Sequence, residues 1–274
     1  PAVPALLRLR RATKRLSFFD QWEEWVGDDG RVHAHYNLAL VDTGRRSADN
    51  PNVQQVPKDS YMRSCFGAPP GRVFLEIDSS QTEVRWMAEL SGDATLRRLF
   101  DEGRDVYRFV AARLILNCAE GEVTKDARQA AKAVVLGFQY GMGARKFVSY
   151  ARDTFGVVFT EAEAGQLRVG FFELFPGILD YHARRRAAVY KYRRVQAPSG
   201  RFRHLTDVVS LEGWRQGEAV RQAINSPIQT AGGDWNLGAI DELVLGDQLA
   251  ALGAVVVGDV HDAVLIECGP DSWP

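Results

Sequence analysis

A chain of 274 residues is long enough for one large domain or two smaller ones with a well-buried core. Its composition is that of an ordinary globular protein, with 46% hydrophobic and 25% charged residues, and no apolar run approaches the roughly 20 residues of a membrane span. These values exclude a disordered chain and an integral membrane protein, and the net charge of -1 argues against a surface coated with positive charge.

The N-terminal third contains a basic segment, a partly alternating segment and a turn-rich segment. Residues 1–16, PAVPALLRLRRATKRL, are rich in Arg and free of acids, which predicts a basic amphipathic helix, with a transit peptide as the alternative. Residues 31–42 alternate partly between apolar and polar side chains and predict a strand. The turn residues of 43–57 predict that this strand enters a long ordered loop.

A strand followed by a helix is predicted next. Residues 72–78, RVFLEID, predict a buried strand that ends at Asp78. Residues 79–92 predict a helix capped by serine and closed by Gly92. A carboxylate at the end of a strand, directly before a helix, marks a functional location. The pattern from about 93 to 195 is mainly helical, with apolar residues three and four apart.

One helix in this region carries two cations beside an apolar stretch. Residues 128–141 read RQAAKAVVLGFQYG, and positions four apart on a helix advance by only about 40°, so they share one stripe. Such a stripe fits a nucleoside triphosphate lying lengthwise, with its phosphates at the cations. The alternative is a surface helix whose long basic side chains reach solvent. The stripe consists of Arg128, Lys132, Leu136 and Tyr140.

Positive charge is concentrated in residues 183–203, ARRRAAVYKYRRVQAPSGRFR. This segment has eight Lys and Arg residues and no acid, with Tyr190, Tyr192 and Phe202 among them. Such a segment can pair with phosphates while its rings contact bases or sugars. A solvated helix face is the alternative interpretation.

The last third predicts a helix over 217–253 and then a β-hairpin. Its strands are 254–260 and 263–268, with Asp262 at the tip. Asp78 and Asp262 each lie at the end or bend of an apolar strand, and two carboxylates brought together there suit Mg²⁺ and substrate phosphates. Considered singly, each aspartate also fits a turn or cap residue.

Several of these segments resemble motifs of family A DNA polymerases, the bacterial DNA polymerase I group. DSSQTEVR at 78–85 is similar to the first catalytic motif, RQAAKAVVLGFQYG to the fingers helix, and VHDA at 260–263 to the third motif. Further matches occur, in the family order, at 43–57, 198–203 and 221–234.

The resemblance implies an α+β fold, in which a polymerase palm with an antiparallel sheet carries a helical fingers subdomain. We expect the palm at 1–92, with a thumb stub at about 5–20, the fingers at 93–197, and the rest of the palm at 198–274. The thumb and the exonuclease domain are expected to be absent or truncated.

The resemblance also implies residue roles. Asp78 and Asp262, with the backbone of Ser79, would hold two Mg²⁺ ions. Arg128 and Lys132 would bind the triphosphate and stabilise charge on the departing pyrophosphate. Further contacts to the dNTP are implied for Leu136, Tyr140, Gln81 and Glu83, the last as a gate against a ribose 2′-hydroxyl. Contacts to DNA are implied for Arg45, Arg201, Arg203, Asn225, Gln229 and His261.

The sequence departs from the family pattern at the metal site and in the fingers helix. Ala263 stands where Glu is usual, and Asp259 where Gln is usual; we hypothesise that Asp259 or Glu267 supplies part of the missing negative charge. Leu136 replaces an aromatic residue, which predicts slower incorporation and favours an origin in a phage or prophage.

The expected function is template-directed DNA synthesis from dNTPs on a primer 3′-hydroxyl. A single-subunit phage-type RNA polymerase and a catalytically weakened DNA-binding replication module are the alternatives. The expected partners are primer-template DNA and dNTPs, with no membrane, for a monomer in the cytoplasm of a bacterial or phage-infected cell. Three widely spaced cysteines without a CxxC pair fit a reducing compartment.

Overall fold

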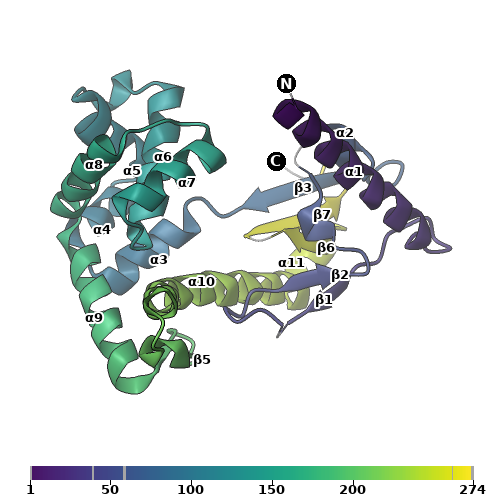
Figure 1. Ribbon diagram of the computed structural model, residues 1–274. Coiled ribbons are helices and arrows are strands. Elements are labelled where there is room, and N and C mark those ends of the chain that lie inside the picture. Colours follow the sequence, from purple (N-terminus) through teal and green to yellow (C-terminus); the bar gives the residue numbers. More distant parts are fainter. Residues whose placement is uncertain (1, 39, 58–59, 261, 273–274) are drawn as a thin grey trace. The chain divides into compact units, whose positions relative to one another are not determined.

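The computed structural model forms two compact units. Unit 1 contains Pro1–Ser80 and Gly233–Pro274, and unit 2 contains Gln81–Gly232, with helix α10 (Gly213–Leu245) contributing to both (Figure 1). The predicted palm and fingers boundaries differ from this division and stay a prediction. The structure describes residues 2–38, 40–57, 60–260 and 262–272.

Unit 1 is built on a three-stranded antiparallel sheet in the order β3-β7-β6 (Figure 1). Alternate side chains of a strand point to opposite faces, and Leu75, Val264 and Ile266 form a cluster with Ile240 of α10. Because Asp78 lies an odd number of residues from Leu75, it points to the other face. The predicted hairpin is confirmed, and the strands are β3 (Val73–Asp78), β6 (Val255–Val260) and β7 (Ala263–Cys268).

The prediction that β3 is a buried strand is wrong. Five of its six residues are exposed, including Val73 and Ile77, whereas β7 is almost wholly buried. The difference follows from the sheet order, because β7 lies between two strands and β3 lies at an edge. An apolar run shows that a segment forms a strand, but it does not show where in the sheet that strand lies.

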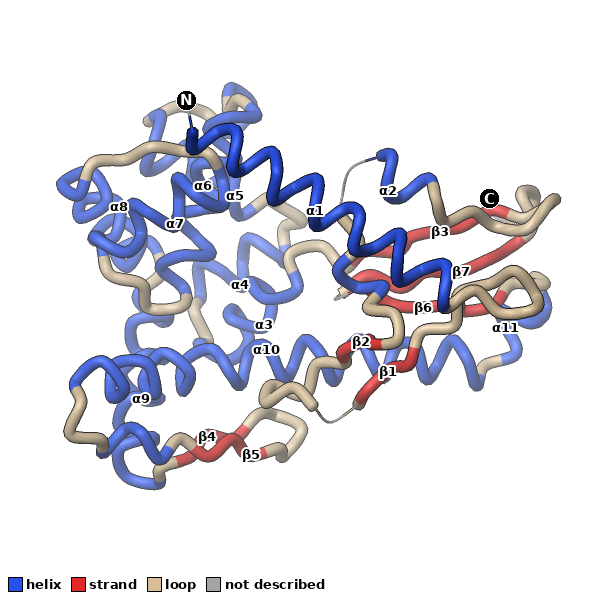
Figure 2. The backbone as a smooth tube through the Cα atoms, turned by 45° about the vertical axis from the view of Figure 1, so that its right-hand side comes forward, coloured by secondary structure: helices blue, strands red, loops and turns tan. Residues whose placement is uncertain are grey.

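The N-terminal segment of unit 1 is helical, as predicted. Helix α1 packs Phe18 and Trp22 against Met62 of α2, while Leu9 and Leu16 are exposed. The predicted strand over 31–42 is much shorter, because only the residues of β1 pair with β2 (Figure 2). Besides the three-stranded sheet and α10, the elements of unit 1 are α1 (Ala2–Glu24), β1 (His35–Asn37), β2 (Ser47–Asp49), η1 (Val53–Gln55), α2 (Ser60–Ser64) and α11 (Asp247–Ala251).

Unit 2 is mainly helical, which confirms the prediction for 93–195 (Figure 2). Its centre is aromatic, with the Phe138 ring 4.5 Å from that of Phe147 and 5.9 Å from that of Phe171. The elements are α3 (Thr82–Ser91), α4 (Ala94–Asp101), α5 (Val106–Val110), the π-helical η2 (Ala111–Leu116), η3 (Glu120–Glu122), α6 (Lys125–Gln139), α7 (Ala144–Phe155), α8 (Glu161–Leu174), α9 (Pro176–Tyr192), β4 (Arg194–Gln196), β5 (Phe202–His204) and η4 (Thr206–Val209).

The two ends of α3 differ in how well the sequence predicts them. Gly92 closes the helix in the left-handed conformation, with φ 70°, as predicted. The predicted serine cap is wrong: Gln81 is the N-cap residue, with φ 57° and no side-chain capping bond. Across the described residues, no helix is both long enough and apolar enough to cross a membrane.

Candidate active site

The fold of unit 1 brings the two predicted aspartates to the same end of the sheet. Asp78 is the last residue of β3, and its cross-strand partner is Ala263, the residue directly after Asp262. The Ser79 amide donates a hydrogen bond to the Asp262 carbonyl over 3.4 Å. Both aspartate side chains are exposed at the site. Strand pairing therefore places two aspartates that are far apart in the sequence at the same end of the sheet.

These groups fit magnesium by their chemistry. Carboxylate and carbonyl oxygens are the ligands that Mg²⁺ prefers, and Mg²⁺ is usually held by one or two carboxylates together with substrate phosphates. Within the described part of the chain, no three His, Cys, Asp or Glu side chains are grouped to hold a metal. Asp78, Asp262 and the Ser79 carbonyl therefore suit ions shared with a phosphate-bearing substrate, not a closed structural metal site.

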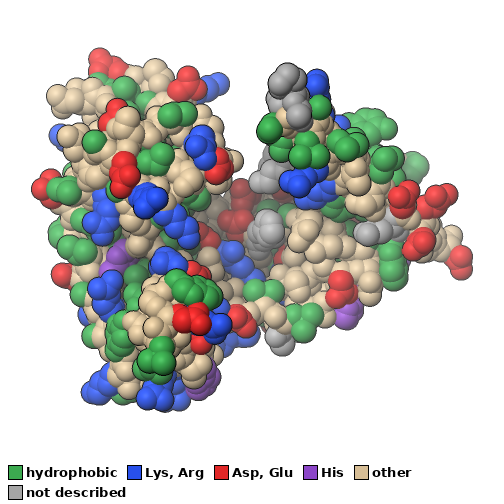
Figure 3. All heavy atoms as spheres, viewed as in Figure 1, with side chains coloured by type: hydrophobic (Ala, Val, Ile, Leu, Met, Phe, Trp, Pro, Cys, Tyr) green, Lys and Arg blue, Asp and Glu red, His purple; other side chains and the backbone are tan. Residues whose placement is uncertain are grey.

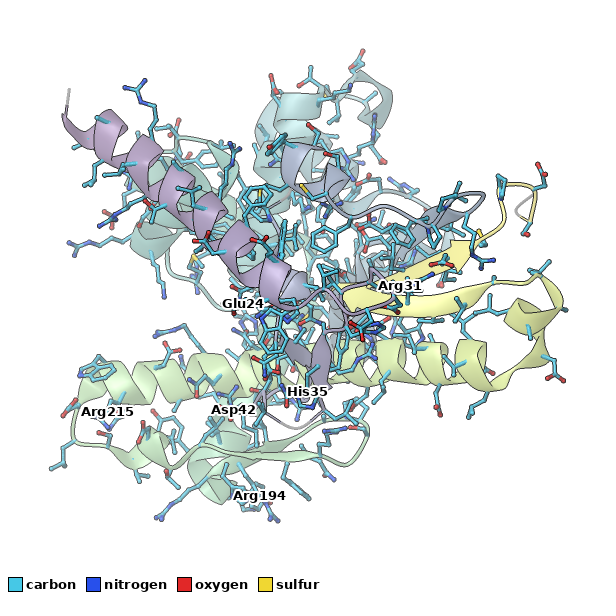
Figure 4. The ribbon with its side chains drawn as sticks, turned by 90° about the vertical axis from the view of Figure 1, so that its right-hand side faces the viewer. Glu24, Arg31, His35, Asp42, Arg194 and Arg215 are labelled. Atoms are coloured by element: carbon cyan, nitrogen blue, oxygen red, sulfur yellow. The ribbon has the colours of Figure 1, made fainter. Side chains whose placement is uncertain are left out.

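Glu267 does not replace the carboxylate missing at Ala263. Its side chain is buried on β7, where Arg31 (2.8 Å) and Arg72 (2.5 Å) bind it; Figure 4 shows Arg31 beside the strands of the sheet. The hydrogen bond from Arg31 lowers the pKa of Glu267. Glu267 pairs with Phe74, four residues along β3 from Asp78, or roughly 13 Å at about 3.3 Å per residue.

Asp259 is also bound by an arginine. Its buried carboxylate lies 3.0 Å from Arg46 and accepts a 3.4 Å hydrogen bond from the Gln54 amide. Arginines therefore already neutralise both acids that were hypothesised to supply the missing charge. This geometry argues against the hypothesis.

In unit 2, Glu83 and Tyr140 are in direct contact. Glu83 lies in the first turn of α3 and Tyr140 follows the last residue of α6, and the Tyr140 hydroxyl donates a hydrogen bond to the Glu83 carboxylate. The structure therefore brings together two of the residues for which the resemblance implies contacts to the dNTP. The bond fixes the direction in which the Glu83 carboxylate points.

The cationic stripe of α6 is present in the structure. From Ala130 to Tyr140, every residue is buried except Lys132, Leu136 and Tyr140. The alternative of an ordinary surface helix is therefore wrong, because α6 crosses the core of unit 2 and exposes this one stripe. Arg128, one turn earlier, is also half-exposed.

Two residues that were not predicted lie against the cations of the stripe. Asp105, the N-cap residue of α5, binds Arg128, and the ring of Tyr107 lies near both Arg128 and Lys132. Burial raises the pKa of Tyr107 to about 12. An Asp directly before an apolar helical run is a recognisable cap signal, but the sequence holds no signal for its contact with Arg128.

The predicted DNA-binding residues lie in both units. In unit 2, Asn225 and Gln229 are four residues apart and share one face of α10, and Arg203 of β5 donates to the Ser226 hydroxyl over 2.9 Å. In unit 1, Arg45 is half-buried beside Gly233. Arg201 is exposed in the β4-β5 turn, and His261 lies outside the described residues.

The basic segment 183–203 forms the end of α9 and the β4-β5 hairpin, and Lys and Arg side chains gather over this region (Figure 3). The Arg194 guanidinium lies 4.3 Å from the centre of the Phe202 ring; Figure 4 labels Arg194 on the hairpin. Tyr192 and Phe202 are both exposed. Exposed rings among cations suit single-stranded nucleic acid.

Aspartates at the end of an antiparallel sheet and a cationic helix that ends in a Glu-Tyr contact are typical of nucleic-acid polymerases. Comparison of the sequence with known protein families identifies which family of polymerases this chain resembles. The model for DNA polymerase family A matches residues 1–274. The chain therefore belongs to DNA polymerase family A.

Relatives and a solved structure agree with this assignment. DNA polymerase I of Aquifex aeolicus is 31% identical to this chain, and the match covers 97% of this chain and 44% of that protein. DNA polymerase I of Pseudomonas aeruginosa is 33% identical, and the match covers 98% of this chain and 30% of that protein. The polymerase domain of Pol1 from M. smegmatis, in complex with DNA primer-template and dNTP, matches with a TM-score of 0.85 and 30% identity over 97% of this chain and 47% of that one. The chain thus spans less than half the length of these proteins, and the match confirms the predicted mixed fold.

Proposed function

We propose that the protein catalyses template-directed DNA synthesis, transferring deoxynucleotides from dNTPs to a primer 3′-hydroxyl with release of pyrophosphate. The observation that carries this proposal is the placement of Asp78 and Asp262 at one end of the sheet in a family A chain. The similar solved structure is a complex with primer-template and dNTP, which supports the same partners here.

The residues of unit 1 would bind the metal ions. Asp78, Asp262 and the Ser79 carbonyl would hold two Mg²⁺ ions, which when bound supply activation of the attacking oxygen and stabilisation of the leaving oxygen. The exposure of both carboxylates leaves room for substrate phosphates to complete the ligand sets.

The residues of unit 2 would bind the nucleotide. Arg128 and Lys132 would pair with the triphosphate and offset the charge that develops on pyrophosphate. Leu136 would lie against the base, and Gln81 near the sugar. Glu83, directed by Tyr140, would occupy the space of a ribose 2′-hydroxyl and so select deoxyribose.

Affinity for DNA would come mostly from phosphate contacts and would fall with salt, because binding releases counterions. The residues proposed for these contacts are Arg45, Arg201, Arg203, Asn225, Gln229 and His261. The template supplies the sequence information, so one monomer suffices. The proposed origin in a phage or prophage rests on Leu136 and on the divergent motifs.

The two other functions make different predictions. An RNA polymerase would use rNTPs at least as well as dNTPs, whereas the Glu83-Tyr140 contact favours deoxyribose. Ala263, which lacks the usual carboxylate, is the observation that favours a catalytically weakened DNA-binding module.

Primer extension with Mg²⁺ tests the proposal. We expect wild-type protein to extend a primer with dNTPs in preference to rNTPs, and Asp78→Asn to abolish extension. Asp101→Asn, which removes an exposed carboxylate at the end of α4, is the matched control and should keep full activity. DNA binding without extension would support the weakened module instead.

A further inference from the structure

Asp105 is fixed by contacts to both of its carboxylate oxygens. Oδ1 accepts hydrogen bonds from the backbone amides of Tyr107 (2.9 Å) and Arg108 (3.1 Å), which caps α5. Oδ2 lies 2.8 Å from both Nε and Nη2 of Arg128. Because the backbone amides of α5 hold Oδ1, Oδ2 has a defined position. Its contacts with Nε and Nη2 fix the plane of the Arg128 guanidinium.

This contact occupies only one edge of the guanidinium. A guanidinium has five N–H donors in a rigid fork, and Asp105 engages those of Nε and Nη2. Nη1 remains directed elsewhere, and the Arg128 side chain is 36% exposed. The geometry therefore presents a second, oriented edge to an anion, as the fork geometry of arginine allows.

Tyr107 supports both cations of the stripe. Its ring centre lies 5.3 Å from the Arg128 guanidinium and 6.0 Å from the Lys132 ammonium. Like charges four residues apart on a helix repel, and the negative face of an aromatic ring offsets part of that repulsion. With its pKa raised to about 12, the phenol stays neutral wherever a polymerase works.

The support is rigid because it belongs to the core of unit 2. Tyr107 is 5% exposed, and its neighbours Val106 and Val110 on α5 are fully buried. Helix α5 packs directly against α6, which carries both cations. Positioning groups on packed helices hold a site more precisely than groups on loops.

We propose that Asp105 and Tyr107 are positioning residues that present Arg128 and Lys132 to a polyphosphate as one preformed unit. The proposal rests on the proposed function, because the polyphosphate is that of the incoming nucleotide. It makes a prediction that simple charge attraction does not. Asp105 lowers the positive charge of the site, so attraction alone predicts tighter binding without it, whereas positioning predicts weaker binding.

The variant Asp105→Asn separates these two outcomes. Asn caps a helix about as well as Asp, so α5 keeps its start while the carboxylate that holds Arg128 is lost. The probe is inorganic tripolyphosphate, titrated by calorimetry without DNA or metal. We expect its Kd to rise about tenfold, as for loss of a hydrogen bond to a charged group. An unchanged or lower Kd would overturn the proposal.

Glu120→Gln is the matched control for this variant. Glu120 also pairs with an arginine of unit 2, Arg104, which is not part of the stripe. Its loss should leave the Kd for tripolyphosphate unchanged. A rise equal to that of Asp105→Asn would show a general effect of removing an ion pair and would count against positioning.

Tyr107 is tested by separating its ring from its hydroxyl. Tyr107→Phe keeps the ring and should bind tripolyphosphate within about twofold of wild type, whereas Tyr107→Leu should weaken binding about fivefold. A melting curve confirms that the Leu variant is folded. Equal losses in both variants, or no loss in a folded Leu variant, would contradict a role for the ring.

Failure of the proposed function would look different. Arg128→Ala should weaken tripolyphosphate binding whatever reaction the protein catalyses. If wild-type protein binds tripolyphosphate, responds to Asp105→Asn and yet extends no primer, the proposed function fails and the positioning role stands. If the primer is extended while both positioning variants bind normally, the positioning role fails alone.

Discussion

Asp78 and Ala263 are cross-strand partners at the end of the β3-β7 pair, so a methyl group stands beside the predicted metal-binding carboxylate where the family usually has an acid nearby. Ala263 is 5% exposed, on the same strand as the paired Glu267. Position 263 therefore adds no carboxylate to those of Asp78 and Asp262.

Restoring the acid by Ala263→Glu should make stability depend on metal. Like charges directly opposite each other on a sheet destabilise it, so in EDTA we expect a loss of about 1 kcal/mol in the free energy of unfolding. Mg²⁺ should recover most of that loss. Ala263→Gln, which has the same length without the charge, should not respond to Mg²⁺ in thermal unfolding. Equal behaviour of the two variants would argue against a metal site at this end of the sheet.

Removing the proposed sugar gate should relax discrimination between nucleotides. Glu83→Ala leaves space near the Tyr140 hydroxyl, and we expect the ratio of dNTP to rNTP incorporation to fall by about tenfold or more. Glu89→Ala, on the exposed side of the same helix, is the control. Competition between the two nucleotides on one primer-template measures the ratio. If the ratio does not change, Glu83 has no part in sugar selection.

An aromatic residue on the stripe should speed incorporation. Leu136 is half-exposed between the cations and Tyr140, and base-aromatic stacking is worth about 1 kcal/mol or more. We expect Leu136→Phe to raise the single-turnover rate about threefold. Leu136→Met, similar in size but without a ring, should match wild type. A Phe variant no faster than the Met variant would remove the stacking explanation.

The ion pairs of Glu267 with Arg31 and Arg72 should make the stability of unit 1 depend on pH in the acidic range. The hydrogen bond from Arg31 lowers the pKa of Glu267 from its ordinary 4.5, so the folded state binds protons less readily than the unfolded chain. The resulting stabilisation is complete above about pH 4.5 and is lost as pH falls through the lower, folded-state pKa.

Glu267→Gln tests this pH dependence. At neutral pH we expect a loss of about 2 kcal/mol, modest for a buried ion pair because both arginines remain partly in solvent. The difference from wild type in the free energy of unfolding should shrink as pH falls below about 4.5. Urea unfolding at several pH values measures it, and a constant difference down to pH 3 would be the contrary result.

Local patterns predicted the elements and the stripe well. The spacing of apolar residues predicts α6 and its stripe, and the apolar runs predict the strands that end at Asp78 and begin at Ala263. The position of β3 at the edge of the sheet could not be predicted, because central strands and edge strands can have the same apolar run.

The missed features are contacts between distant segments. The sequence allows Asp259 and Glu267 as metal-site acids, and only the folded structure shows that Arg46 and Arg72 bind them. The same holds for Asp105, whose capping role is visible in the sequence but whose contact with Arg128 is not. Ion pairs of this kind depend on which loops the fold brings together, and a single sequence carries no period or spacing that encodes them.

From Ala130 onward, α6 is buried except at its stripe, and this separates two roles within one helix. Its alanines, valines and Phe138 are buried in the core of unit 2, whereas Lys132, Leu136 and Tyr140 are only half-buried. Substitutions at the three half-buried positions, which are proposed to contact the nucleotide, should therefore cost less folding stability than substitutions at the buried positions of α6. Libraries confined to these sites should yield mostly folded proteins with changed nucleotide choice.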